Sequence, residues 1–173
     1  MNVLIRCACL GVWLLAWAAP AWAADAVFVD GGLSDTPSGW LLQGGARWDW
    51  GWHMALSDSL HLGGAWQLGL AYGHWRETTE SSDDSIDVNI TPILRLQWRQ
   101  GMTLEGGVGA HLLGNFPKNR VSSAFQFGSL VGVGYPLIRD VMLGIRFQHL
   151  SNAGINAPNG GINMYLLHIE YNY

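Results

Sequence analysis

A histidine and a serine, His149 and Ser151, stand two residues apart at the end of an apolar segment. A serine hydroxyl becomes a nucleophile when a neighbouring base takes its proton, and histidine is the usual base. Because residues i and i+2 of a β-strand project from the same face, a strand here presents both groups together. The pair could equally be two interfacial residues where a strand meets lipid headgroups, so the rest of the chain has to decide between the two interpretations.

The face that carries this pair is the apolar one. Counting back in steps of two from His149 gives only apolar residues: Phe147, Ile145, Leu143 and Val141. The opposite face is mixed and includes Arg146 and Gln148. In a soluble protein the pair would therefore be buried, whereas in a membrane barrel it would face lipid.

The first residues predict a secretory signal peptide over 1–23, with cleavage near Ala23 or Ala24. A positive start, a short apolar stretch and an Ala-x-Ala end are typical of such peptides. Both cysteines lie within it, so disulfides and thiol chemistry are excluded from the mature chain. The remaining residues, 24–173, are expected to form one domain.

The composition favours an outer-membrane barrel. Charged residues make up only 13% of the chain, while glycine (23) and tryptophan (10) are abundant. No segment after residue 23 is apolar for long enough to form a transmembrane helix. The net charge of −4 gives no basis for binding nucleic acid.

Alternation of apolar and polar or small residues predicts the fold class: all-β, an eight-stranded antiparallel up-and-down transmembrane β-barrel. The first two segments are expected at about 26–33 and 40–50, followed by a short link near 51–59. Short links then alternate with longer polar loops, which places both termini in the periplasm and the long loops outside. A soluble lipocalin-like barrel would need a polar outward face, and here that face is apolar.

An interior only wide enough for side chains argues against a diffusive pore. Nine ionisable residues are expected to pair inside: Arg47, Asp49, Arg95, Arg99, Glu105, His111, Arg146, His168 and Glu170.

The outer end of the seventh segment could hold a complete nucleophilic site. Antiparallel pairing with the eighth segment can place Asn163 beside His149, where it would fix the tautomer of the imidazole. Donors for a tetrahedral oxyanion could come from the loop Asn152-Ala153-Gly154 or from Asn159.

The stretch His149-Leu150-Ser151-Asn152-Ala153-Gly154, followed by Pro158-Asn159-Gly160-Gly161-Ile162, resembles the motif of the lipid A 3-O-deacylase (PagL) family. The resemblance implies that His149 is the base, Ser151 the nucleophile and Asn159 an oxyanion-hole residue. The acid of the family, typically a Glu, falls on Asn163, which is a departure.

An amide can orient an imidazole, but it supplies no charge to stabilise the imidazolium. In a serine protease triad, the change from Asp to Asn costs roughly 10⁴ in turnover. Three alternatives stay open: the site works with Asn163, it is slow, or an acid from a loop takes the role.

The resemblance implies an eight-stranded serine esterase of the Gram-negative outer membrane. It would hydrolyse the ester-linked acyl chain at the 3-position of lipid A, releasing a 3-hydroxy fatty acid, with no cofactor or metal. The expected partners are lipid A or lipopolysaccharide of the outer leaflet and the membrane itself, and a homodimer is left open. The alternatives are a structural or adhesion barrel without chemistry and an acyltransferase.

Overall fold

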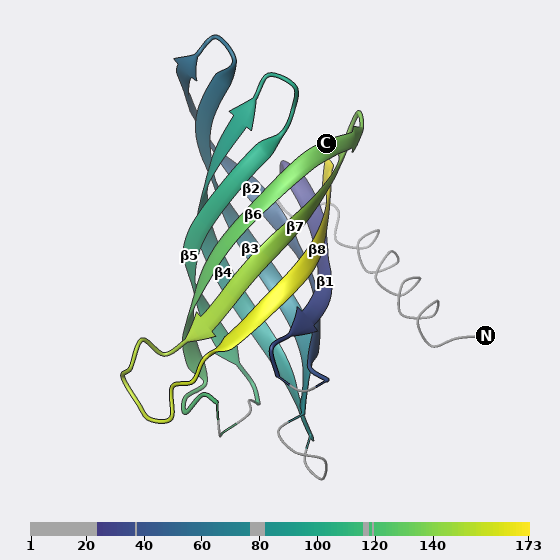
Figure 1. The fold of residues 1–173 in the computed structure, drawn as a ribbon. Coiled ribbons are helices and arrows are strands. Elements are labelled where there is room, and N and C mark those ends of the chain that lie inside the picture. The colour runs from purple at the N-terminus through teal and green to yellow at the C-terminus, as the bar shows by residue number, and fades with distance from the viewer. Residues whose placement is uncertain (1–23, 37, 77–81, 116–117, 119) are drawn as a thin grey trace, which may run out of the picture.

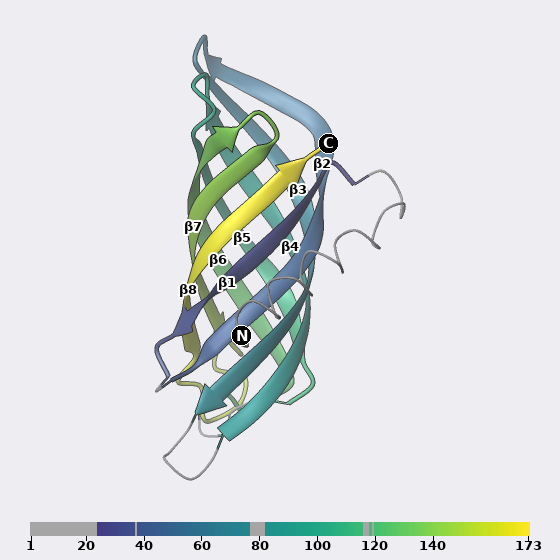
Figure 2. The same ribbon diagram turned by 90° about the vertical axis from the view of Figure 1, so that its right-hand side faces the viewer.

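The computed structural model describes residues 24–173 except 37, 77–81, 116–117 and 119; the predicted signal peptide, 1–23, lies outside the described residues. Eight antiparallel strands close into one barrel in sequence order, with β8 pairing back onto β1 (Figures 1 and 2). The predicted fold class is therefore confirmed. The described residues contain no helix of the length and apolarity that a membrane span requires. The strands are β1 (Ala26–Ser34), β2 (Trp40–Ser57), β3 (Leu60–Arg76), β4 (Ser82–Trp98), β5 (Thr103–Leu113), β6 (Phe125–Ile138), β7 (Val141–Ser151) and β8 (Ile162–Asn172).

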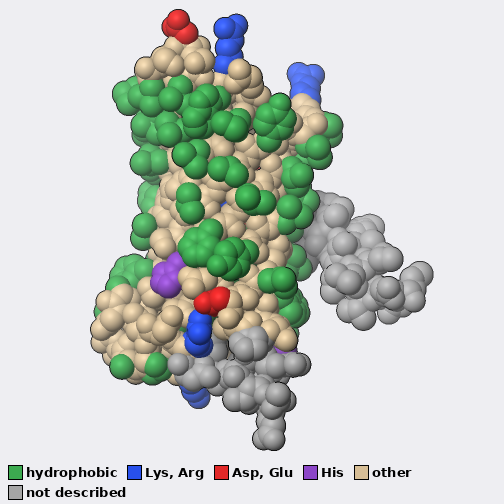
Figure 3. Space-filling model, viewed as in Figure 1, with side chains coloured by type: hydrophobic (Ala, Val, Ile, Leu, Met, Phe, Trp, Pro, Cys, Tyr) green, Lys and Arg blue, Asp and Glu red, His purple; other side chains and the backbone are tan. Residues whose placement is uncertain are grey.

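The alternation in the sequence becomes the inside and the outside of the wall. In β7 every second residue is buried in the barrel, and the residues between them, including Leu143 and Ile145, face outward. Apolar side chains cover much of the outer wall in Figure 3. Because apolar surface is costly to expose to water but not to hydrocarbon, the outer wall is suited to lipid.

Short turns join the strands at the end where β1 begins and β8 ends, and the longer connections lie at the other end (Figure 1). The β6–β7 turn, for example, holds only Arg139 and Asp140 between the strands. We call the opposite end, which carries the connections around 35–39 and 152–161, the long-loop end.

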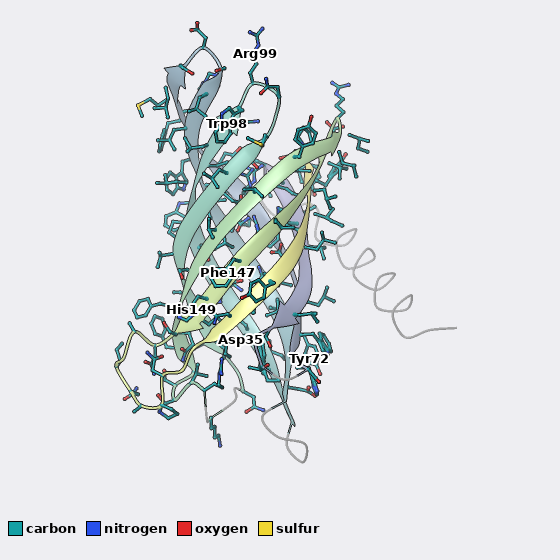
Figure 4. The ribbon with its side chains drawn as sticks, in the orientation of Figure 1. Asp35, Tyr72, Trp98, Arg99, Phe147 and His149 are labelled. Atoms are coloured by element: carbon teal, nitrogen blue, oxygen red, sulfur yellow. The ribbon has the colours of Figure 1, made fainter. Side chains whose placement is uncertain are left out.

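Two details of the sequence interpretation are wrong. Residues 51–57 belong to β2 and are not part of a link: a register shift between Asp49 and His53 lets the strand continue, so the β2–β3 hairpin reaches beyond its neighbours. Arg99 does not pair inside the barrel. It lies exposed in the β4–β5 turn, at the tip of the molecule in Figure 4.

A chain of buried ion pairs fills the interior. Arg146 contacts Asp30 and Glu105, while Glu105 also contacts Arg95, which in turn reaches Glu170. Side chains from strands on opposite sides of the barrel thus meet across its axis. An interior filled by side chains is expected for a barrel of eight strands, which is just wide enough to hold them.

Candidate active site

His149 and Ser151 project from the outer face of β7, at the long-loop end. Both are half-buried, and they alternate with Gln148 and Leu150, which are buried inside the barrel. Figure 4 shows His149 near Phe147 and Asp35, at the lower end of β7 and β8. The two groups are therefore placed at the depth where the apolar wall gives way to polar loops.

Asn163 of β8 lies directly beside His149. The two residues are partners in the β7–β8 ladder, and Nδ1 of His149 is 2.7 Å from Oδ1 of Asn163. An amide oxygen only accepts hydrogen bonds, so this contact requires the proton of the neutral imidazole to sit on Nδ1. Nε2 is then unprotonated and able to act as a base.

The orientation of the Asn163 amide is fixed from its other side by Asp35, in the loop after β1. The side-chain nitrogen of Asn163 donates to Asp35 Oδ2 (2.8 Å), and its backbone N–H donates to Oδ1 (3.1 Å). Arg120 donates to the same carboxylate (2.9 Å) and, through Nε, to the carbonyl of Gly161 (3.0 Å). The result is a continuous chain of contacts from Arg120 through Asp35 and Asn163 to His149.

The backbone of Gly161 lies against the edge of the imidazole that is formed by Cε1 and Nε2. Its backbone has a φ of +66°, and a Cβ added there would lie 2.6 Å from Cε1 and 3.2 Å from Nε2 of His149. Since Leu150 pairs with Ile162, the next positions along the two strands are Ser151 and Gly161. The Nε2 edge of the ring therefore lies at the Ser151 end of the site.

The hydroxyl of Ser151 makes no hydrogen bond within the described part of the chain, so it can rotate toward Nε2. A second serine, Ser129, is the β6 partner of His149 in the ladder and also faces outward. Ser129 lies level with the ring, and not at its Nε2 end. Of the two serines, Ser151 is therefore the better placed candidate for a nucleophile, and its hydrogen bond to Nε2 can form when substrate is bound.

The residues expected to bind an oxyanion are joined by hydrogen bonds within the connection between β7 and β8. The N–H of Asn152 donates to Oδ1 of Asn159 (3.0 Å), and the N–H of Gly154 donates to Oδ1 of Asn152 (2.9 Å). Both backbone donors are thus engaged within the loop. The side-chain nitrogen of Asn159 has no such engagement among the described residues and is the donor left for a ligand.

A groove in the outer wall begins next to this site, on the side toward the middle of the barrel. It has a volume of about 500 Å³ and is bounded by the outward side chains of three neighbouring strands. Those side chains are Val131 and Val133 of β6, Ile145 and Phe147 of β7, and Tyr165 and Leu167 of β8. Phe147 and Ile145 are two and four residues before His149, so the groove runs from the polar site toward the middle of the apolar wall.

Comparison with known proteins agrees with this architecture. The model of the lipid A 3-O-deacylase (PagL) family matches residues 42–172. The chain belongs to the lipid A 3-O-deacylase (PagL) family. It is 30% identical over 141 residues to the lipid A deacylase PagL of Bordetella bronchiseptica, covering 80% of this chain and 72% of that protein. It is 27% identical over 175 residues to the lipid A deacylase PagL of Pseudomonas aeruginosa, covering 96% of each.

A crystal structure of the outer membrane enzyme PagL has the same fold, with a TM-score of 0.75 at 24% identity, over 86% of this chain and 99% of that one. Membership of the PagL family and the apolar outer wall together place the chain in the Gram-negative outer membrane.

The sequence interpretation gave no part in this candidate site to three residues that the structure places there: Asp35, Arg120 and Gly161. Asp35 follows β1 and Asn163 begins β8, so closure of the barrel between β1 and β8 is what brings them together. A closed barrel already predicts that the first and last strands are neighbours, so the sequence could have indicated that residues just after β1 lie near the start of β8. Arg120 lies in the connection between β5 and β6, and its guanidinium binds Asp35 and the carbonyl of Gly161.

Proposed function

We propose that this PagL-family chain is a lipid A 3-O-deacylase that works as a serine esterase, with Ser151 as nucleophile, His149 as base and Asn163 as the residue that orients the base. The observation that carries the proposal is the hydrogen bond from Nδ1 of His149 to Asn163, on the lipid-facing side of the wall. It leaves an unprotonated ring nitrogen beside a serine, at a depth where an ester of an outer-leaflet lipid can reach it.

The reaction proceeds in two balanced halves. Oγ of Ser151 attacks the ester carbonyl carbon while Nε2 of His149 takes the hydroxyl proton. The tetrahedral intermediate collapses, and the sugar oxygen leaves with the proton from His149, so an acyl-serine remains. Water then attacks the acyl-serine with His149 as base, and the 3-hydroxy fatty acid is released as Ser151 recovers its proton.

Asn159 is the proposed donor to the oxyanion of both tetrahedral intermediates. Its oxygen accepts from the N–H of Asn152, so the amide is held in one orientation with its nitrogen turned away from that contact. Asn152 in turn is buried and donates to Ser122 Oγ and the carbonyl of Asn156, which fixes the loop before any substrate arrives. A donor held in advance stabilises developing charge without reorganisation at the moment of reaction.

The groove next to the site fits the acyl chain of the substrate. A lipid in the outer leaflet approaches sideways, lays its chain against Ile145 and Phe147, and brings the ester up to Ser151. No cofactor or metal is part of this scheme, since the nucleophile, the base and the donor are all side chains of the protein.

Mass spectrometry of lipid A from cells that express the wild type or Ser151→Ala tests the proposal. We expect a lipid A species lighter by one 3-hydroxyacyl group with the wild type only. A heavier species would indicate an acyltransferase. An unchanged spectrum with folded wild-type protein in the outer membrane would indicate a barrel without chemistry, and either result would overturn the proposal.

Filling the groove should change the preferred chain length. Ile145→Trp places a larger side chain in the groove, and each CH₂ that loses its contact costs about 0.8 kcal/mol, roughly fourfold in kcat/KM. We expect long acyl esters to be hydrolysed more slowly than by the wild type, while short ones are hardly affected. Rates on a series of esters of increasing chain length measure this.

The matched control for that series is Val108→Trp, a similar change on the outer wall of β5, away from the groove. Equal chain-length profiles for the two variants would show that the groove does not hold the acyl chain.

Gly161→Ala should slow the reaction at least about 10-fold. The added methyl group would collide with Cε1 and Nε2 of His149 and displace the imidazole from its position. Gly51→Ala is the control: Gly51 also has a positive φ (+71°), but nothing lies within 4 Å of a Cβ there. Backbone strain is thus common to the two variants and contact with the imidazole is not. Similar losses of ester hydrolysis in both would argue against positioning of His149 by Gly161.

A further inference from the structure

Asp35 presents the only carboxylate in contact with the His149–Asn163 pair among the residues that the structure describes. It comes from the loop after β1, although the site itself is built from β7 and β8. The closing seam of the barrel, where β1 pairs with β8, brings it there: Ser34 is the partner of Met164, and the N–H of Asp35 donates to the carbonyl of Asn163 (2.9 Å).

The contacts between Asp35 and Asn163 are directional. A carboxylate only accepts, so the side-chain group of Asn163 that faces Asp35 must be its NH₂, and the group that faces His149 must be its oxygen. Without Asp35, the amide could turn by 180° and donate to Nδ1, which would move the imidazole proton to Nε2 and leave no base for Ser151. The same error of tautomer is what disables a protease triad when its Asp is replaced by Asn.

Asp35 also carries charge. Partial burial alone would raise the pKa of its carboxyl, but the hydrogen bonds from Asn163 and the nearby Arg120 guanidinium hold that pKa below the ordinary value. The carboxyl group is therefore ionised at neutral pH and lies one amide away from the ring that becomes an imidazolium.

From these contacts we infer that Asp35 is a positioning residue of the proposed deacylase, which acts through Asn163: the two together do the work of the single acid of the family. The inference rests on the proposed function. Asp35 fixes the amide of Asn163 in the orientation that makes His149 a base, and its charge stabilises the imidazolium through the polarised amide.

Exchange of the two residues provides the test. In Asp35→Asn the shape of the side chain is kept, but its negative charge is lost and the orientation of the Asn163 amide is no longer fixed. In the double variant Asp35→Asn/Asn163→Asp, the carboxylate moves next to His149 and the amide moves to the loop, so the pair and its total charge are restored. Ester hydrolysis is measured as kcat and KM separately, with purified barrels in detergent micelles.

We expect Asp35→Asn to lower kcat by about 10- to 100-fold, as happens when carboxylates that orient metal-bound histidines are removed. KM should change little, because Asp35 lies behind Asn163 and not on the substrate side. Asp35→Glu should retain part of the activity, and the exchanged double variant should recover at least most of the wild-type kcat.

Thr36→Val is the control for a role in shaping the loop alone. It removes the contact between the hydroxyls of Thr36 and Ser34 in the same loop without touching Asn163, and its kcat should stay within about twofold of the wild type. The inference is overturned if Asp35→Asn keeps the wild-type kcat, if Thr36→Val is equally slow, or if the exchanged variant fails to recover. Loss of the proposed function is distinguishable, because then the wild type and Ser151→Ala would already be equal.

Discussion

Ser151→Ala and His149→Ala should each lower the rate of ester hydrolysis by orders of magnitude, and the double variant should be no slower than either single one. In a serine protease, removal of the nucleophile or of the base alone costs about 10⁶ in kcat, nearly as much as removal of the whole triad. The reason is that the two groups act in one step: without the base the hydroxyl keeps its proton, and without the hydroxyl the base has nothing to deprotonate. Rates of the three variants measured on one ester in micelles test this non-additivity.

Ser129→Ala is the matched control, because Ser129 is an outward-facing serine directly across the ladder from His149. It should hydrolyse the ester at close to the wild-type rate, since Nε2 of His149 is turned toward Gly161 and the Ser151 end of the site. If Ser129→Ala were inactive and Ser151→Ala active, the nucleophile would be on β6 and the assignment would be wrong. If the losses from Ser151→Ala and His149→Ala multiplied in the double variant, the two residues would not act as a pair.

The alternation of side chains was enough to predict the barrel and which face each residue occupies. In β7 and β8 the period of two is unbroken, so the outward position of His149 and the pairing with Asn163 followed from the strand pattern. The pattern failed where the backbone is irregular. At Gly51 the φ is positive and the register shifts nearby, so β2 continues where the sequence indicated a link.

Loops follow no such period, and most of what the sequence did not reveal comes from them. Asp35 and Asn163 are 128 residues apart, and their contact depends on how a short connection turns after β1. The engaged N–H groups of Asn152 and Gly154 likewise depend on a turn whose geometry the sequence did not specify. The sequence left three alternatives open for the amide at position 163. Only the three-dimensional structure shows that an acid from a loop, Asp35, contacts this amide.

Arg146→Met should destabilise the barrel by about 3–5 kcal/mol, the usual cost of removing one partner from a buried ion pair. Arg146 has no exposed side-chain surface and contacts Asp30 (3.0 Å) and Glu105. Its loss leaves these buried carboxylates without their shared cation. The measurement is the free energy of unfolding in urea, followed by tryptophan fluorescence in micelles.

Arg139→Met is the surface control: this side chain is 95% exposed in the β6–β7 turn, so its replacement should change the free energy of unfolding by at most about 0.5 kcal/mol.

A second change separates charge balance from lost packing. The interior contacts join three arginines (Arg47, Arg95 and Arg146) to three carboxylates (Asp30, Glu105 and Glu170). Arg146→Met combined with Glu105→Gln restores that balance, so the double variant should be more stable than Arg146→Met alone. If it were less stable by the full sum of the two single losses, the uncompensated charge would not be the cause, and the barrel would depend on the packing of the Arg146 side chain instead.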